Sequence, residues 1–342
     1  MSVQATEEAP SGDAGLAGLV GPDVLGLLGQ VRSRLAGRWG GSSLLAATCG
    51  HALTPAGKLF RPILLLESAL AVGGDPHRVL PAAVGAESGH VASLVHDDII
   101  DGDDTRRGRA AAHAAYGVES AIVAGDALIF DLFAGLAECH SAGAPADRVV
   151  AALGVVSRCG IDLCRGQSLE AEFCASGRFD HDTYLRMVRL KTAALFRAAC
   201  ECGALLAGGD ARQVLALGRY AQHLGVAFQI RDDLLPYQGS AGKPDTSDVR
   251  NGRITLPVIV AHRTGDAADR AAIETALSGV DDPRAARVDL AAVLARTGAV
   301  RATARWARHY AGLAVAALAA LPDTASRERL RGYAAAAVDR DL

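Results

Sequence analysis

Residues 96–108 read HDDIIDGDDTRRG and gather five aspartates and two arginines in one short stretch. In a helix over residues 87–101, Asp97, Asp98 and Asp101 would project from one face near the C-terminal end. The helix dipole is negative at that end, so the cluster is unfavourable without cations. Carboxylates suit Mg²⁺, which commonly bridges one or two of them to substrate phosphates. The alternative is a water-exposed acidic helix end, and for this motif alone that is the better interpretation.

A second acidic pair, Asp232 and Asp233, ends another apolar helical segment in FQIRDDLLPYQG, residues 228–239. Two helices that each end in Asp-Asp can face each other across a cavity and hold Mg²⁺ between them. The second pair is weak evidence alone. Together the two motifs favour a site for several cations and a polyanion.

Cations suited to a diphosphate stand in four short motifs, GKLFRP, TRRG, LKTAALF and GKPDTSDVRNGR, and they are Lys58, Arg61, Arg106, Arg107, Lys191 and Lys243. The planar fork of arginine binds phosphate oxygens in pairs, whereas lysine acts as a point charge. Each of these residues alone is typical of a surface charge, but several beside acidic motifs indicate polyanion binding. The other arginines nearby are interpreted as surface or supporting charges, and they are Arg109, Arg165, Arg231 and Arg250.

Two further polar residues share helical faces with the aspartates. His90 lies two helical turns before Asp97, and Gln229 lies one turn before Asp233. For His90, ligand contact and a purely structural role both stay open.

Long helices must position these groups. Helical spacing recurs along the chain, strand-like alternation is scarce, and Gly-, Pro- and Asp-rich stops separate segments of about 20–30 residues, long against the ~11–12 residue mean. The pattern predicts one all-α domain over residues 21–342, a large bundle of long, mostly antiparallel helices after a disordered tail at residues 1–20. No GxGxxG or GxxxxGK[ST] motif follows an apolar strand, which argues against strand-based nucleotide folds.

Composition narrows the class further. The 342 residues are 50% hydrophobic with a formal charge of −3, which creates no field for nucleic acid or an anionic membrane. Seven cysteines and no signal-peptide pattern fit reduced thiols in a cytosol. No run approaches the roughly 18 apolar residues needed to cross a bilayer. We therefore expect a cytoplasmic protein without a transmembrane segment.

In order, these motifs resemble the trans-isoprenyl diphosphate synthase (polyprenyl synthetase) family over about residues 57–257. The matching motifs are Gly57-Lys58-x-x-Arg61-Pro62, Glu87-x-x-His90, Asp97-Asp98-x-x-Asp101, Arg106-Arg107-Gly108, Gly125-Asp126, Gly166-Gln167, Lys191-Thr192, Phe228-Gln229-x-x-Asp232-Asp233, Gly242-Lys243 and Thr255-Leu256-Pro257. The resemblance implies a helical bundle around a deep central cavity, usually paired as a homodimer. It also implies head-to-tail condensation of an allylic diphosphate with isopentenyl diphosphate.

The resemblance also implies roles by position. Asp97, Asp101 and Asp232 would ligate three Mg²⁺ ions, with Asp98 and Asp233 supporting them. Arg106, Lys191 and Lys243 would bind the allylic diphosphate. Isopentenyl diphosphate would be held by Lys58, Arg61, His90 and Arg107. Thr192 and Gln229 would lie beside the allylic carbon, where their dipoles favour developing positive charge.

Three residues depart from the family pattern. Pro236 stands where the second motif usually has its last aspartate, and we expect retained activity with an altered Mg²⁺ dependence. Glu170 replaces an aspartate and Arg253 replaces a lysine, and both substitutions keep the charge.

Product length depends on what blocks the growing chain. The family's bulky floor residues correspond to Ser93 and Ala92, which are small here. Phe130, or another side chain of the neighbouring helix, is the expected replacement. The best interpretation is a C20 product, geranylgeranyl diphosphate, with farnesyl or longer products as alternatives.

Two other functions fit some of the motifs. A terpene cyclase would share the fold and the acidic motifs but would not need the second diphosphate pocket. A non-catalytic subunit of a heterodimeric synthase can lose acidic residues, as Pro236 illustrates, but the intact motif at residues 97–101 argues against it.

Overall fold

The computed structural model describes residues 18–237, 246–279 and 282–338. Its elements are α2 (Pro22–Arg38), α3 (Leu44–Leu53), α4 (Phe60–Ala71), η1 (Pro76–Val79), α5 (Leu80–Asp101), β1 (Thr105–Arg106), β2 (Arg109–Ala110), α6 (Ala112–Tyr116), α7 (Val118–Ser141), α8 (Ala146–Ser176), α9 (His181–Leu206), α10 (Ala211–Asp232), η2 (Leu235–Tyr237), α11 (Ser247–Arg250), α12 (Leu256–Thr264), α13 (Ala267–Leu277), α14 (Pro283–Arg296), α15 (Ala299–Ala317), η3 (Leu318–Ala320) and α16 (Ala325–Ala336). The predicted all-α fold is confirmed. Residues 1–17 of the predicted tail lie outside the described residues, whereas Leu19 and Val20 already pack against the core.

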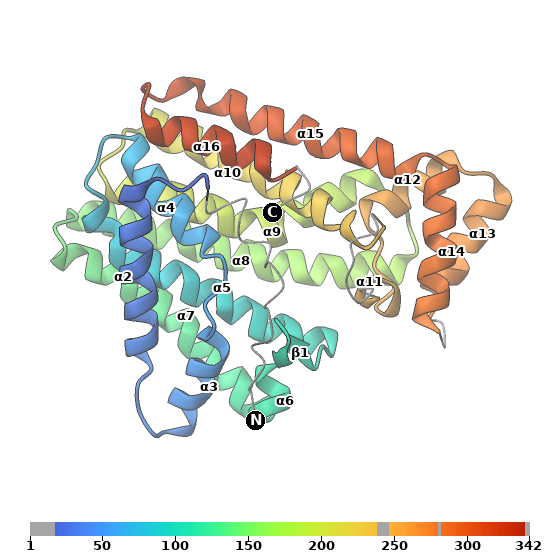
Figure 1. Ribbon diagram of the computed structural model, residues 1–342, viewed down its shortest axis with the longest axis horizontal. Coiled ribbons are helices and arrows are strands. Elements are labelled where there is room, and N and C mark those ends of the chain that lie inside the picture. Colours follow the sequence, from blue (N-terminus) through green and yellow to red (C-terminus); the bar gives the residue numbers. More distant parts are fainter. Residues whose placement is uncertain (1–17, 238–245, 280–281, 339–342) are drawn as a thin grey trace, which may run out of the picture.

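Three long helices form the centre of the bundle. Helix α9 packs between α8 and α10, and α15 covers the other side of α10 (Figure 1). Figure 1 also shows α13 and α14 at one end of the molecule and α2 and α3 at the other. Helix α5 packs most extensively against α7. The chain thus builds a layered bundle in which α5, α8, α9 and α10 can contribute to a shared interior.

Capping signals determine where the acidic motifs fall. Helix α5 ends at Asp101, and Gly102 follows in the left-handed conformation at φ 65°, with its backbone N–H donating to the Asp98 carbonyl. Glycine adopts this conformation without the Cβ penalty, so it terminates the helix just beyond the aspartates. Helix α10 begins with a capping box of Asp210 and Gln213 and ends at Asp232. Both acidic motifs therefore lie in the last turn of a helix.

A short hairpin follows α5. Strands β1 and β2 pair antiparallel, with Arg106 opposite Arg109. The two turn residues, Arg107 and Gly108, both have positive φ, as a tight hairpin turn requires. This turn holds the arginines of the TRRG motif close to the end of α5.

Within the described residues, α7 is long and apolar enough to span a membrane by length and composition alone, contrary to the expectation that no segment would be. One such helix is weak evidence, because a packed helix of a soluble protein passes the same test. Its buried face, which includes Ala121, Ala124 and Leu128, belongs to the main core cluster.

Candidate active site

A cavity of about 1400 Å³ lies between α5, α8, α9 and α10, with contributions from α4, η2, α11 and α14. Asp97 and Asp101 of α5 and Asp232 of α10 all line it. The two acidic helix ends therefore face one common hollow rather than separate regions of solvent.

The first acidic motif is divided between two environments. Asp97 lines the cavity, and burial raises its pKa, although the Lys191 ammonium opposes that shift. Asp98 is only 3% exposed and accepts hydrogen bonds from Arg106, with 2.9 Å between the Arg106 Nε and the Asp98 Oδ1. Asp98 therefore orients Arg106, which itself lines the cavity.

The two carboxylates of the second acidic motif both line the cavity but differ in their hydrogen bonding. Burial, reinforced by the neighbouring Asp233, raises the pKa of Asp232 to about 7. Asp233 is 4% exposed and accepts hydrogen bonds from the Tyr184 hydroxyl at 2.6 Å, from the Gln229 amide at 2.9 Å and from the Leu256 backbone N–H at 3.3 Å. Both carboxylates line the cavity, but that of Asp233 is already engaged by these three donors.

A chain of hydrogen bonds joins α9 to α10 at the cavity wall. The Thr192 hydroxyl donates to the Gln229 side-chain carbonyl at 2.7 Å, and the Gln229 amide donates to Asp233. Tyr184 completes the chain from the other side of Asp233. Sequence reasoning missed Tyr184, although it lies two helical turns before Lys191 on the same face of α9.

Lys191 is held by a carboxylate from the neighbouring helix. Its ammonium lies 2.5 Å from the Glu170 carboxylate of α8. The two helices approach closely here, since a Cβ on Gly166 would stand 2.5 Å from the Lys191 backbone nitrogen. The Gly166 position thus permits the contact that orients Lys191.

Three of the four residues predicted to hold isopentenyl diphosphate line the cavity, namely Arg61, His90 and Arg107. The Arg61 guanidinium lies 5.0 Å from the centre of the Phe196 ring. Burial lowers the Arg61 pKa to about 10, and Glu87 opposes the shift. Burial and the surrounding arginines hold the His90 pKa well below its ordinary value, so this imidazole is neutral.

Two of these groups have unused hydrogen-bonding atoms. The Arg61 Nε and the His90 Nδ1 are buried and have no hydrogen-bond partner within the described chain. Such atoms are costly to leave unsatisfied, which indicates that a ligand normally supplies partners. Lys58 does not line the cavity, but its charge acts on Asp232. Lys243 lies outside the described residues.

Arg253 and Arg250 pair with carboxylates at the end of the first acidic motif and just after it. Arg253 donates to the Asp101 carboxylate at 2.6 Å and also pairs with Asp248 at 3.4 Å. Arg250 pairs with Asp103 and lines the cavity, so its interpretation as an ordinary surface or supporting charge is incomplete. The position of Arg250 in the sequence gave no indication that it would pair with Asp103.

The acidic side chains fit Mg²⁺ in chemistry but not as a self-contained cage. Asp97, Asp101 and Asp232 present the hard oxygen ligands that Mg²⁺ prefers. Among the described residues, no three His, Cys, Asp or Glu side chains are grouped closely enough to hold an ion alone. A metal in this cavity would therefore share its ligands with water and a polyanionic substrate.

The apolar wall of the cavity includes Ser93, Leu163, Leu195 and Phe228. Ser93 lines the cavity, as predicted for a floor position, whereas Ala92 is buried in the core and does not. The suggestion that Phe130 closes the cavity is wrong for this chain, because its side chain is 73% exposed and absent from the lining. It lies on the outward face of α7.

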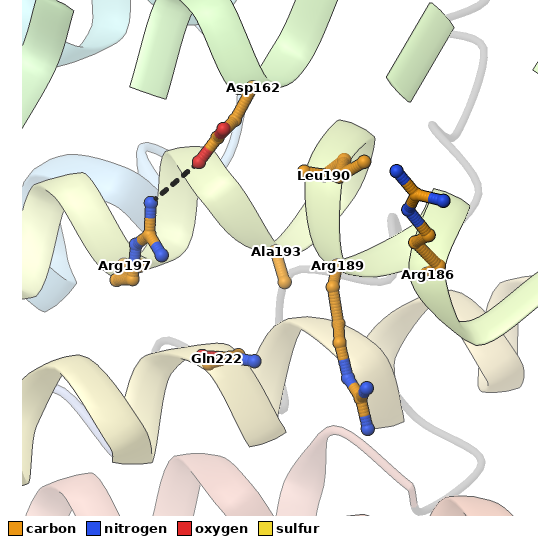
Figure 2. Close-up of a pocket in the computed structure, with 7 residues that line it drawn as sticks. All are labelled: Asp162, Arg186, Arg189, Leu190, Ala193, Arg197 and Gln222. Atoms are coloured by element: carbon orange, nitrogen blue, oxygen red, sulfur yellow. Dashed lines mark hydrogen bonds and ion pairs between the residues drawn. The ribbon is translucent and has the colours of Figure 1, made fainter. Parts of the chain in front are cut away.

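A second, smaller hollow of about 210 Å³ lies on the opposite face of α9 (Figure 2). Arg186, Arg189 and Arg197 line it, and its single carboxylate, Asp162, accepts a 2.9 Å hydrogen bond from Arg197. Because it contains none of the acidic-motif residues, this hollow does not combine metal-binding and diphosphate-binding groups.

Comparison with known proteins agrees with this geometry. Residues 42–293 match the polyprenyl synthetase family. The chain is 35% identical over 294 residues to a short chain isoprenyl diphosphate synthase of Methanothermobacter thermautotrophicus, covering 85% of this chain and 89% of that protein. It is 38% identical over 295 residues to a (2E,6E)-farnesyl diphosphate synthase of Mycobacterium bovis, covering 83% and 80% of the two chains.

Solved structures show the same fold. A geranylgeranyl pyrophosphate synthetase from Pyrococcus horikoshii superposes with a TM-score of 0.86 at 31% identity, covering 95% of this chain and 98% of that one. A polyprenyl synthase from Caulobacter crescentus, solved with calcium and isoprenyl diphosphate, gives 0.87 at 30% identity, covering 97% and 100%. The chain therefore belongs to the polyprenyl synthetase family and is a prenyltransferase.

Proposed function

We propose that this enzyme condenses an allylic diphosphate head-to-tail with isopentenyl diphosphate, in a Mg²⁺-dependent reaction that releases diphosphate. One observation carries the proposal: a single cavity combines two acidic helix ends, a separate group of cations and an apolar wall. Acidic groups and cations suit two diphosphates, and the apolar wall suits a prenyl chain.

The proposed roles follow from these positions. Asp97, Asp101 and Asp232 would hold three Mg²⁺ ions, and Asp98 and Asp233 orient their neighbours. The allylic diphosphate would bind Arg106, Lys191 and Lys243. Isopentenyl diphosphate would bind Lys58, Arg61, His90 and Arg107.

Breaking the allylic C–O bond places negative charge on the diphosphate and positive charge on carbon. Arg106 and Lys191, each oriented by a carboxylate, stabilise the first charge without reorganising. The Thr192 hydroxyl and the Gln229 carbonyl direct their dipoles toward the second. Bound magnesium supplies further neutralisation of the diphosphate. The isopentenyl double bond then forms the new C–C bond, and the departing diphosphate accepts the released proton.

The decisive test is incubation of the purified chain with dimethylallyl diphosphate, isopentenyl diphosphate and Mg²⁺, followed by chromatography of the dephosphorylated products. Longer prenyl alcohols are expected, and Asp97→Asn or Asp232→Asn should reduce kcat by roughly two orders of magnitude. Hydrocarbon made from a longer prenyl diphosphate without elongation would indicate a cyclase. A folded chain without any turnover would indicate a non-catalytic subunit.

A C20 product is the proposed chain length. The small Ser93 on the cavity wall supports a product longer than a bulky residue would allow. Ser93→Phe should therefore shorten the product, while Phe130→Ala should leave it unchanged, since that ring lies outside the cavity. An unaltered product from Ser93→Phe would remove α5 from control of chain length.

The proposed state is a cytoplasmic homodimer of single-domain chains. Helix α7 presents an exposed apolar stripe consisting of Val118, Ile122, Val123, Ile129 and Phe130. Several exposed apolar side chains on one helix are typical of a protein–protein interface.

A further inference from the structure

Arg287 of α14 is a cavity-lining cation that no sequence motif indicated. It stands one helical turn before Ala291, which also lines the cavity. Leu290, Val293 and Leu294 of the same helix are buried in a hydrophobic cluster and fix the position of α14. The helix therefore holds the Arg287 guanidinium at the cavity wall.

Within the described residues, the guanidinium of Arg287 hydrogen-bonds only to a neutral backbone atom. The Arg287 Nη1 donates to the Pro236 carbonyl at 2.7 Å. Within the described residues, no carboxylate lies within ion-pair distance of Arg287, whereas Arg106, Arg250 and Arg253 each pair with at least one. In this part of the chain, no ion pair thus neutralises the Arg287 charge.

The Nε of Arg287 is buried and has no hydrogen-bond partner in the described part of the chain. A buried donor without an acceptor is destabilising, so an acceptor supplied by a ligand would offset this cost. The guanidinium fork matches the paired oxygens of a phosphate group.

The position of Arg287 indicates which kind of ligand its guanidinium would bind. Pro236 follows Asp233 by three residues, so the guanidinium lies at the end of the second acidic motif. Proline contributes no carboxylate there, and the local balance of charge is shifted toward the cation. An anion held at Asp232 through Mg²⁺ would meet the Arg287 guanidinium rather than a third aspartate.

We propose that Arg287 binds the allylic diphosphate at the end of the second acidic motif, directly through its guanidinium. This inference rests on the proposed function and adds to it a binding residue on α14. The test measures binding of inorganic diphosphate to the full-length chain with Mg²⁺ by calorimetry, which requires no turnover.

Arg287→Gln should weaken diphosphate binding about tenfold and raise KM for the allylic substrate more than it lowers kcat. Arg287→Lys should recover part of the affinity, because it keeps the charge but not the fork. Arg284→Gln is the matched control, an exposed arginine of the same helix that does not line the cavity, and it should bind like the wild type.

Thermal unfolding of each variant separates binding from a structural role. If Arg287→Gln lowers the melting temperature but binds diphosphate as tightly as the wild type, Arg287 only supports Pro236 and the inference is wrong. A wild type that binds diphosphate but elongates no substrate would overturn the proposed function. The effect of Arg287→Gln on diphosphate binding could still be measured in that case. A wild type that fails to bind diphosphate would overturn both.

Discussion

Glu87 is a buried carboxylate that stabilises the positive charge of Arg61, a proposed substrate-binding residue. Its side chain is 1% exposed, and burial raises its pKa against the opposing charges of Arg61 and Arg107. Arg61 in turn is stabilised in its charged form by Glu87. Removing the Glu87 charge is costly, because the buried Arg61 charge is then less compensated.

Glu87→Gln should therefore raise KM for isopentenyl diphosphate about tenfold or more, with a smaller effect on the allylic substrate, as Arg61 loses its orienting charge. Initial-rate kinetics with each substrate varied separately measure the split. Glu201→Gln is the control, because Glu201 faces Arg197 outside the main cavity. Equal changes for both substrates would contradict a specific role at Arg61.

His90 makes stability depend on pH in a direction that its environment dictates. Its pKa in the folded chain lies well below 6.5 because of burial and the nearby arginines. The unfolded chain therefore binds the proton more readily, and the stability due to neutral His90 is present above about pH 6.5 and lost as the pH falls below it.

The loss from this residue should approach about 1.4 kcal/mol for each pH unit below 6.5. We expect His90→Asn to lose less unfolding free energy than the wild type between pH 7.5 and 5.5, as measured by denaturant titration at both values. Identical losses in the two proteins would show that His90 is protonated in the fold.

At the scale of elements, the contact between α8 and α9 determines the geometry of Lys191. Gly166 is buried where the helices meet, and its missing side chain allows Glu170 to reach the Lys191 ammonium. A methyl group at that position would collide with backbone rather than with a flexible side chain. The helices would have to separate.

Gly166→Ala should lower the unfolding free energy by about 1–3 kcal/mol through overpacking and should reduce kcat as Lys191 moves. Gly160→Ala on the same helix is the control. Its Cβ would meet nothing within 4 Å, so it should stabilise the protein by about 0.5–1 kcal/mol. Urea titrations measure the unfolding free energy of both variants. If both substitutions stabilise the protein equally, the contact between α8 and α9 can accommodate a methyl group at position 166.

At the scale of the whole molecule, the exposed apolar stripe on α7 is the feature that one chain does not explain. Phe130 is 73% exposed and Ile122 is 43% exposed, although α7 buries its other face against the core. Exposing this surface to water would favour aggregation unless another surface covers it.

Ile122→Glu combined with Phe130→Glu should convert the proposed dimer of 35.2 kDa chains to monomers, because two carboxylates would be buried in the interface without partners. Light scattering after gel filtration measures the mass. Leu215→Glu changes an exposed apolar residue of α10 and should leave the mass unaltered. A double variant that stays dimeric would place the interface elsewhere.

Much of the fold was predictable because helix formation depends on local spacing. The recurring helical pattern and the Gly and Pro stops identified an all-α bundle, and Gly102 marked the end of the helix that carries Asp101. The N-terminal boundary was less certain from sequence, since Val20 is already buried. The small hairpin at Thr105–Ala110 was not predicted, because two-residue strands leave no periodicity to detect.

The sequence by itself determined which chemical groups this protein has and which lie on one helical turn, since both follow from residue type and the helical repeat. Only the tertiary structure decided which of them meet. It turned Asp98 toward Arg106 and Asp97 toward the cavity, placed Phe130 outside, and brought Arg287 from α14 to Pro236. These outcomes depend on the packing of helices distant in the chain, and local spacing carries no information about which face of one helix another will cover.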